Sequence, residues 1–98
     1  MPISEQWWLT AIGDTLVWAR LREREAGTAE VFDCDGQTLV YDSPDSARAA
    51  LMDAGFCALD GLDDEDARAL GWERLAIVPP VAESDRALRP LMMRRRRP

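Results

Sequence analysis

This chain has no histidine and no lysine, and all twelve of its basic residues are arginine. Without histidine it lacks the commonest general base at neutral pH, and without lysine it lacks an amine nucleophile. Its two cysteines, Cys34 and Cys57, are too few for a disulfide framework or a zinc knuckle. We therefore expect no catalytic activity, no cofactor and no metal.

Long apolar runs are also absent, and no stretch approaches the roughly 18 residues of a membrane span. The first residues, Met1–Gln6, lack the basic and apolar regions of a secretory signal. Both cysteines have apolar neighbours, where free thiols are common. We expect a cytoplasmic protein with no membrane contact, and nothing in the sequence specifies an oligomeric state.

Negative charge is concentrated in the middle of the chain. Residues 28–73 carry twelve carboxylates and two arginines, whereas the whole protein has a net charge of −6. Such acidity disfavours direct binding to nucleic acid, which requires cations against the phosphates. The hydrophobic content of 47% is sufficient for a packed core.

Two hairpins are indicated in the first half of the chain. Residues 7–12 and 15–21 are rich in Trp, Val, Ile and Leu and flank Gly13-Asp14, a pair suited to a two-residue turn. This turn would place Trp8 opposite Ala19 and Leu9 opposite Trp18. A helix over residues 19–26 is the alternative, because these residues are good helix formers and Gly27 could end it.

The second hairpin consists of residues 30–34 and 37–41 around Asp35-Gly36, with residues 26–28 turning the chain into it. A two-residue turn here pairs Phe32 with Leu39. It places Cys34 and Tyr41 on the same face as these two, and we take that face as part of the core.

Helices follow. Ser43-Pro44 should begin a helix that runs to Ala54, and Asp63 should cap a second over residues 64–70. The buried stripe expected on the first helix is Ala47, Ala50, Leu51 and Ala54. Residues 56–59 suggest a short strand and residues 84–88 one helical turn.

The fold expected is α+β, with an N-terminal antiparallel β-meander of about four strands, then two short helices and an irregular tail. Residues 1–80 would form a single compact domain. Residues 81–98 would be a weakly structured extension ending in a solvated Arg94–Arg97 tail.

Residues 31–39 resemble the first motif of haloacid-dehalogenase-type phosphohydrolases, in which Asp33 would be the nucleophile and Asp35 the general acid. The chain departs from that motif because Gln37 separates Gly36 from the threonine, and because no lysine is available for the phosphate. It is also short for the parallel sheet of that family. A hairpin turn explains the residues without chemistry.

The acidic residues with the weakest structural explanation form a cluster just before and within the second helix. We predict that this cluster binds a basic protein partner, with help from two carboxylates near the first helix and one exposed tryptophan. The predicted contact residues are Asp60, Asp63, Asp64, Glu65, Asp66, Asp42, Asp45 and Trp7. Weak divalent-cation binding and simple solubility are the alternatives for the same cluster.

In overall character the chain resembles the small acidic immunity proteins of bacterial polymorphic-toxin systems, of the type VI and Rhs-like kinds. It shares their small size, acid-rich surface, β-meander with helices and lack of a catalytic set. The resemblance implies binding to a secreted toxin domain and occlusion of its active site. The alternative is an acidic adaptor or nucleic-acid mimic, for example phage-derived, that inhibits another basic protein.

Overall fold

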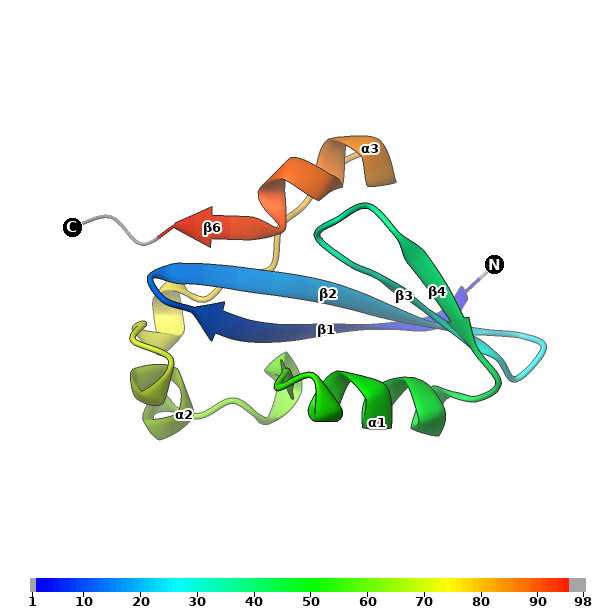
Figure 1. The fold of residues 1–98 in the computed structure, drawn as a ribbon, viewed down its shortest axis with the longest axis horizontal. Helices are drawn as coiled ribbons and strands as arrows, with labels where there is room; N and C mark the ends of the chain where they lie inside the picture. The colour runs from blue at the N-terminus through cyan, green and yellow to red at the C-terminus, as the bar shows by residue number, and fades with distance from the viewer. Residues whose placement is uncertain (1, 96–98) are drawn as a thin grey trace.

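A computed structural model describes residues 2–95 and shows an α+β protein built on one antiparallel sheet of six strands (Figure 1). The sheet order is β4-β3-β2-β1-β5, and β6 pairs with the part of β2 that β3 leaves free. The strands are β1 (Pro2–Ile12), β2 (Thr15–Arg24), β3 (Ala29–Phe32), β4 (Thr38–Tyr41), β5 (Cys57–Ala58) and β6 (Met93–Arg95). The α-helices are α1 (Pro44–Asp53), α2 (Asp64–Ala69) and α3 (Asp85–Leu88), and the 3-10 turns are η1 (Leu59–Gly61), η2 (Arg74–Ala76) and η3 (Arg89–Leu91).

The β1–β2 hairpin is confirmed, and the helical alternative for residues 19–26 is wrong. Ile12 pairs with Thr15 across a two-residue turn, and Gly13 has the positive φ of 62° that this turn requires. Trp8 lies opposite Ala19 and Leu9 opposite Trp18, as predicted. The long strands therefore follow from β-branched and aromatic residues on both sides of a glycine turn.

The β3–β4 hairpin forms, but its predicted register is wrong by one residue. The loop has three residues rather than two, because the backbone N–H of Asp33 donates to Gln37 O at 3.1 Å and Gly36 closes the loop with φ 83°. Val31 therefore pairs with Leu39. The carboxylate of Asp33 stabilises this loop by accepting the backbone N–H groups of Asp35 (3.0 Å) and Gln37 (3.1 Å).

The register change moves side chains between faces, because strand residues alternate. Leu39 and Tyr41 lie on the face of Val31, opposite to that of Phe32. Leu39 is 48% exposed. The predicted core face shared by Phe32, Cys34, Leu39 and Tyr41 is therefore corrected.

Each face of the sheet has its own buried cluster. One face packs against α1, and its buried residues are Trp8, Ala19, Leu21, Ala29, Val31, Ala47 and Leu51. The other face packs against the chain after α1, and its buried residues are Leu9, Leu16, Trp18, Phe32, Ala67, Ile77, Leu88 and Met92. A sheet buried on both faces explains why residues 7–12 of β1 and 15–19 of β2 are nearly continuous apolar runs.

The helix boundaries follow local signals closely. The Ser43 hydroxyl accepts the Ser46 N–H at 3.1 Å, Pro44 occupies the first turn, and Gly55 follows the last turn with φ 88°. Of the predicted stripe on α1, Ala47 and Leu51 are buried, whereas Ala50 is half-buried and Ala54 exposed. The short strand predicted at residues 56–59 is β5.

The C-terminal segment differs most from expectation. Residues 85–95 form α3, η3 and β6, and Leu88 and Met92 are 4% and 0% exposed. The backbone N–H of Trp18 donates to Met92 O at 2.8 Å, which ties this segment to β2. The helical turn predicted at residues 84–88 is confirmed as α3. The expected weak structure is corrected for residues 89–95, and β5 and β6 raise the strand number above the expected four. Arg96 and Arg97 of the predicted tail lie outside the described residues.

Within residues 2–95, no helix combines the length and apolarity needed to cross a lipid bilayer.

Candidate functional site

The acidic cluster predicted from the sequence lies on η1 and the first turn of α2. Two of its carboxylates form a capping box. Asp63 Oδ1 accepts the Asp66 N–H at 2.8 Å, and Asp66 Oδ2 accepts the Asp63 N–H at 3.4 Å. These bonds define the start of the helix, but they leave both charges in place at the surface.

The remaining three carboxylates divide into one that is paired and two that are not. Nε of Arg74 donates to Asp64 Oδ1 at 2.7 Å, and both side chains are largely exposed. Asp60 and Glu65 are exposed and make no side-chain hydrogen bond or ion pair within the described part of the chain. These two are therefore the predicted contact residues with the fewest structural duties.

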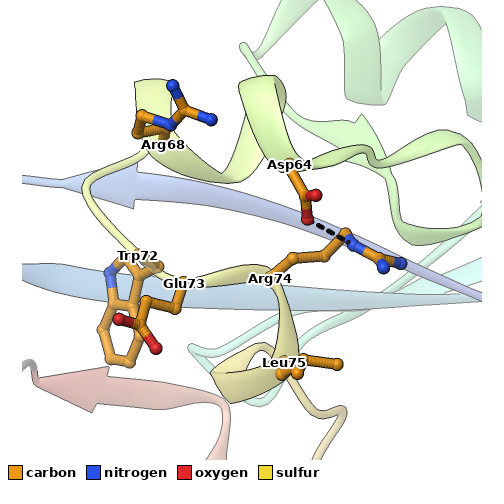
Figure 2. Close-up of a pocket in the computed structure, with 6 residues that line it drawn as sticks. All are labelled: Asp64, Arg68, Trp72, Glu73, Arg74 and Leu75. Carbon is orange, nitrogen blue, oxygen red and sulfur yellow. Dashed lines mark hydrogen bonds and ion pairs between the residues drawn. The ribbon is translucent and has the colours of Figure 1, made fainter.

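A depression of about 280 Å³ adjoins this cluster (Figure 2). It is lined by Asp64, Arg68, Trp72, Glu73, Arg74 and Leu75. We refer to these residues together with Asp60, Asp63, Glu65 and Asp66 as the α2 surface.

Apolar side chains give the α2 surface a second kind of contact. Trp72 is half-buried, with the guanidinium carbon of Arg94 at 5.4 Å from its ring centroid. Arg94, a residue of β6, also donates from Nη1 to Ala76 O at 3.1 Å. This bond holds its guanidinium group against the Trp72 ring. Leu75 is 87% exposed. The sequence prediction missed these residues, and an aromatic directly after the helix-ending Gly71 was the available signal.

The α2 surface is acidic overall. Residues 60–74 contain six carboxylates and two arginines. Burial raises the pKa of the half-buried Cys57 thiol, and the negative charge of Asp66 raises it further. The negative potential of the α2 surface therefore extends to this thiol.

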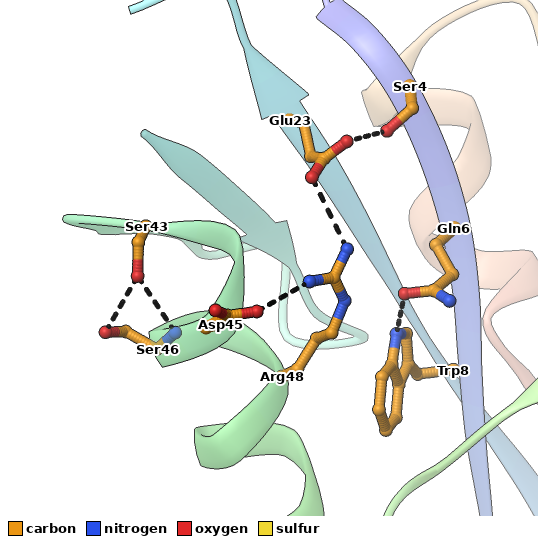
Figure 3. A network of polar contacts seen from close by, with 8 residues as sticks. All are labelled: Ser4, Gln6, Trp8, Glu23, Ser43, Asp45, Ser46 and Arg48. Carbon is orange, nitrogen blue, oxygen red and sulfur yellow. Dashed lines mark hydrogen bonds and ion pairs between the residues drawn. The ribbon is translucent and has the colours of Figure 1, made fainter. Parts of the chain in front are cut away.

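The two carboxylates predicted near α1 do not join this surface. The beginning of α1 and the helix α2 lie at opposite ends of the molecule (Figure 1). Nη1 of Arg48 donates to Asp45 Oδ1 at 3.0 Å, and Nη2 of Arg48 contacts Glu23 Oε1 at 3.4 Å (Figure 3). Asp45 therefore belongs to a network that joins α1 to β2. Asp42 is exposed just before this helix.

Trp7 is half-buried rather than fully exposed. Its ring packs edge-on against Trp18, with centroids 5.8 Å apart and an interplanar angle of 87°. Trp8 lies on the other face, is 3% exposed, and donates from Nε1 to Gln6 Oε1 at 2.8 Å (Figure 3). The tryptophan doublet thus contributes one ring to each of the two cores.

The acidic residues and the two cysteines of residues 2–95 form neither a metal site nor an activated thiol. In the part of the chain that the structure describes, no three His, Cys, Asp or Glu side chains are grouped to hold a metal ion. Burial raises the pKa of Cys34, and Asp35 and Asp33 raise it further, which keeps this thiol protonated at neutral pH. The α2 surface offers charge and shape rather than an activated nucleophile.

No family model, no curated protein and no solved structure matches this chain significantly.

Proposed function

We propose that this protein binds a basic protein partner through the α2 surface and blocks the partner's active site. This is the mode of action of the small acidic immunity proteins of bacterial toxin systems, and the partner would be a secreted toxin domain. The proposed mechanism is occlusion, with no chemical turnover.

The proposal rests on one observation: carboxylates without a partner lie beside an exposed apolar side chain. Asp60 and Glu65 present unpaired charge, and Leu75 lies 87% exposed on the rim of the adjoining depression. Clustered negative potential steers a basic partner and raises its association rate. An exposed leucine beside a half-buried tryptophan supplies the apolar centre that slows dissociation.

The contacts of each carboxylate determine which substitutions test binding without also disturbing the fold. Charge reversal at Asp63 or Asp66 would disrupt the capping box, and reversal at Asp64 would break the pair with Arg74. Substitutions at Asp60 and Glu65 remove charge without removing a contact that supports the fold.

The experiment is co-expression with the product of the neighbouring gene, scored by toxicity of that product and by rescue of bacterial growth, together with binding kinetics for the purified pair. The double variant Asp60→Asn/Glu65→Gln should lower the association rate about tenfold at low salt, with a smaller effect at high salt. Leu75→Ala should raise the dissociation rate about threefold to tenfold.

A matched control removes the same charge elsewhere. Glu25 lies in the β2–β3 loop and Asp42 precedes α1, both exposed at the end of the molecule away from α2 (Figure 1). Glu25→Gln/Asp42→Asn should leave the association rate within about twofold of the parent protein. Equal losses in the two double variants would contradict binding at the α2 surface. Failure to bind the neighbouring gene product would contradict the proposed function itself.

A further inference from the structure

A second region of the molecule combines unpaired arginines with a cavity. The β3–β4 loop lies beside α3 (Figure 1), and two depressions of about 300 Å³ and 420 Å³ lie along this junction. Both depressions are lined by Arg86 and Arg89. Phe32 and Gly36 contribute to the smaller one, and Cys34 and Pro90 contribute to the larger one. We refer to these six residues as the arginine pocket.

The two guanidinium groups are free to bind a ligand. Neither Arg86 nor Arg89 makes a hydrogen bond or an ion pair within residues 2–95. Arg89 is nevertheless held in position, because its side chain lies across Gly36. A Cβ atom built on Gly36 would stand 2.9 Å from the Cδ of Arg89. Glycine therefore allows both the positive φ of the loop and the close approach of the arginine.

A carboxylate that lines the smaller depression is already paired with an arginine. Asp85 lines the smaller depression, and Nη1 of the buried Arg20 lies 2.9 Å from Asp85 Oδ1. This hydrogen bond holds the pKa of Asp85 below its ordinary value, so the ion pair is maintained at neutral pH. Because the charges of Arg20 and Asp85 cancel, the charges of Arg86 and Arg89 remain to attract an anion.

Arg20 lines neither depression, but it contacts two residues of the smaller one, Phe32 and Asp85. It is 4% exposed, its guanidinium carbon lies 5.1 Å from the Phe32 ring centroid, and its Nε–H is buried without a hydrogen-bond partner in the described structure. Native proteins rarely leave such a donor unpaired.

The carboxylates of the β3–β4 loop lie near the Cys34 end of the pocket, where burial and the charges of Asp35 and Asp33 raise the pKa of this thiol. Neither aspartate lines the smaller depression. The carboxylate of Asp33 accepts the amides of Asp35 and Gln37, so its Oδ1 is directed into its own loop. Asp35 is exposed and is not part of the lining of either depression. The remaining wall is largely apolar, from Phe32, Cys34, Pro90 and Met93.

We infer that the arginine pocket binds the phosphate group of a small molecule that also has an apolar or aromatic part. A phosphate dianion matches two guanidinium groups in charge and accepts several hydrogen bonds, whereas a carboxylate carries a single charge. The apolar wall would take the aromatic part, and the cavity sizes are in the range of small-ligand sites. This inference is independent of the proposed function, because the arginine pocket and the α2 surface share no residue.

The test uses phenyl phosphate as the probe, titrated into the full chain by calorimetry and by amide chemical-shift mapping. Shifts should concentrate at residues 33–37 and 84–93. Inorganic phosphate should bind several-fold more weakly, because it lacks the ring. Benzoate should bind at least about tenfold more weakly, because it carries one charge.

Arg86→Ala and Arg89→Ala should each lower the affinity for phenyl phosphate at least about tenfold, the loss expected for a charge-assisted hydrogen bond. Arg68→Ala is the matched control. It removes the same charge from α2 and should leave the affinity within about twofold. Absence of binding at about 10 mM probe would overturn the inference. Equal affinity for benzoate, or an equal loss in Arg68→Ala, would also overturn it.

Discussion

The two faces of the sheet are covered in different ways. One face packs against α1, a regular helix of ten residues that contributes Ala47 and Leu51 to the core. The other face packs against short pieces of helix and connecting chain after residue 61, which contribute Ala67, Ile77, Leu88 and Met92. The depression on the α2 surface and the arginine pocket both involve this second covering.

The two faces differ because one is covered by a continuous helix and the other by several short segments. A continuous helix presents an unbroken stripe of side chains to the sheet and leaves little space between turns. Short helices and turns meet at ends and corners, where depressions form and capping residues carry charge to the surface. Both proposed binding sites therefore lie on the face covered by short segments, which we call the irregular face.

The largest expected effect concerns the core of the irregular face. Trp18 is 1% exposed and packs against Trp7. Trp18→Ala should lower the free energy of unfolding by about 3–5 kcal/mol, measured by urea denaturation. Leu51→Ala, on the α1 face, should cost about 2–4 kcal/mol. If Trp18→Ala lowered the free energy of unfolding less than Leu51→Ala does, the irregular face would contribute less to stability than its burial implies.

The next effect concerns Asp85, whose loss would leave the buried Arg20 without its counter-charge. Asp85→Asn should cost about 1–3 kcal/mol at pH 7, reduced by the partial exposure of Asp85. Asp45→Asn at the start of α1 should cost about 0–1 kcal/mol, because Asp45 is almost fully exposed. Similar costs for the two variants would contradict a special role for the Arg20–Asp85 pair.

The same pair should impose a pH dependence on stability. Arg20 lowers the pKa of Asp85 from its ordinary value of 3.8, so the folded protein binds this proton less tightly than the unfolded chain. The stabilisation is complete above about pH 4 and is lost as the pH falls through the lowered pKa. The difference between the parent and Asp85→Asn should therefore shrink in denaturation curves below about pH 4.

A smaller effect compares the helix caps on the two faces. Ser43→Ala in front of α1 and Asp63→Ala in front of α2 should each cost about 1 kcal/mol. Asp63→Ser should cost only a few tenths of a kcal/mol, because serine caps a helix as well as aspartate does. If Asp63→Ser were as destabilising as Asp63→Ala, the charge of Asp63 rather than its cap would stabilise α2.

The smallest effect tests the electrostatics beside the arginine pocket. The charge of Asp35 contributes to the raised pKa of Cys34. Asp35→Asn should therefore increase the rate of Cys34 alkylation by iodoacetamide at pH 8 about twofold. Cys57 is an internal control, because the carboxylate that raises its pKa is Asp66. An equal increase at both thiols would indicate loosening of the fold instead.

Individual elements show where sequence reasoning succeeded. Gly13-Asp14 predicted the β1–β2 turn and its register, and Ser43 and Asp63 predicted the starts of α1 and α2, because these signals act over a few residues. The β3–β4 register was missed because Asp35-Gly36 is compatible with both a two-residue and a three-residue loop. The Asp33 side chain favours the longer loop.

The candidate sites were less accessible from the sequence. The cluster around α2 was found, because its five acidic residues lie close together in the chain. The cluster lies beside Trp72 and Leu75 and far from Asp45. These relations depend on the positions of α1 and α2 in the fold, which the sequence does not show. The arginine pocket was not found, because its two walls lie about fifty residues apart in the chain.

The sequence by itself determined the four strands of the meander, the β1–β2 turn and the caps of α1 and α2, together with the concentration of negative charge in residues 28–73. Propensity, glycine at positive φ and capping are properties of a few neighbouring residues, so they can be read directly. The tertiary structure decided which carboxylates remain free. It also buried Trp8, packed the partly buried Trp7 against the opposite core, and brought Arg86 and Arg89 against the β3–β4 loop. These outcomes depend on contacts between distant segments, which form only when both faces of the sheet are covered.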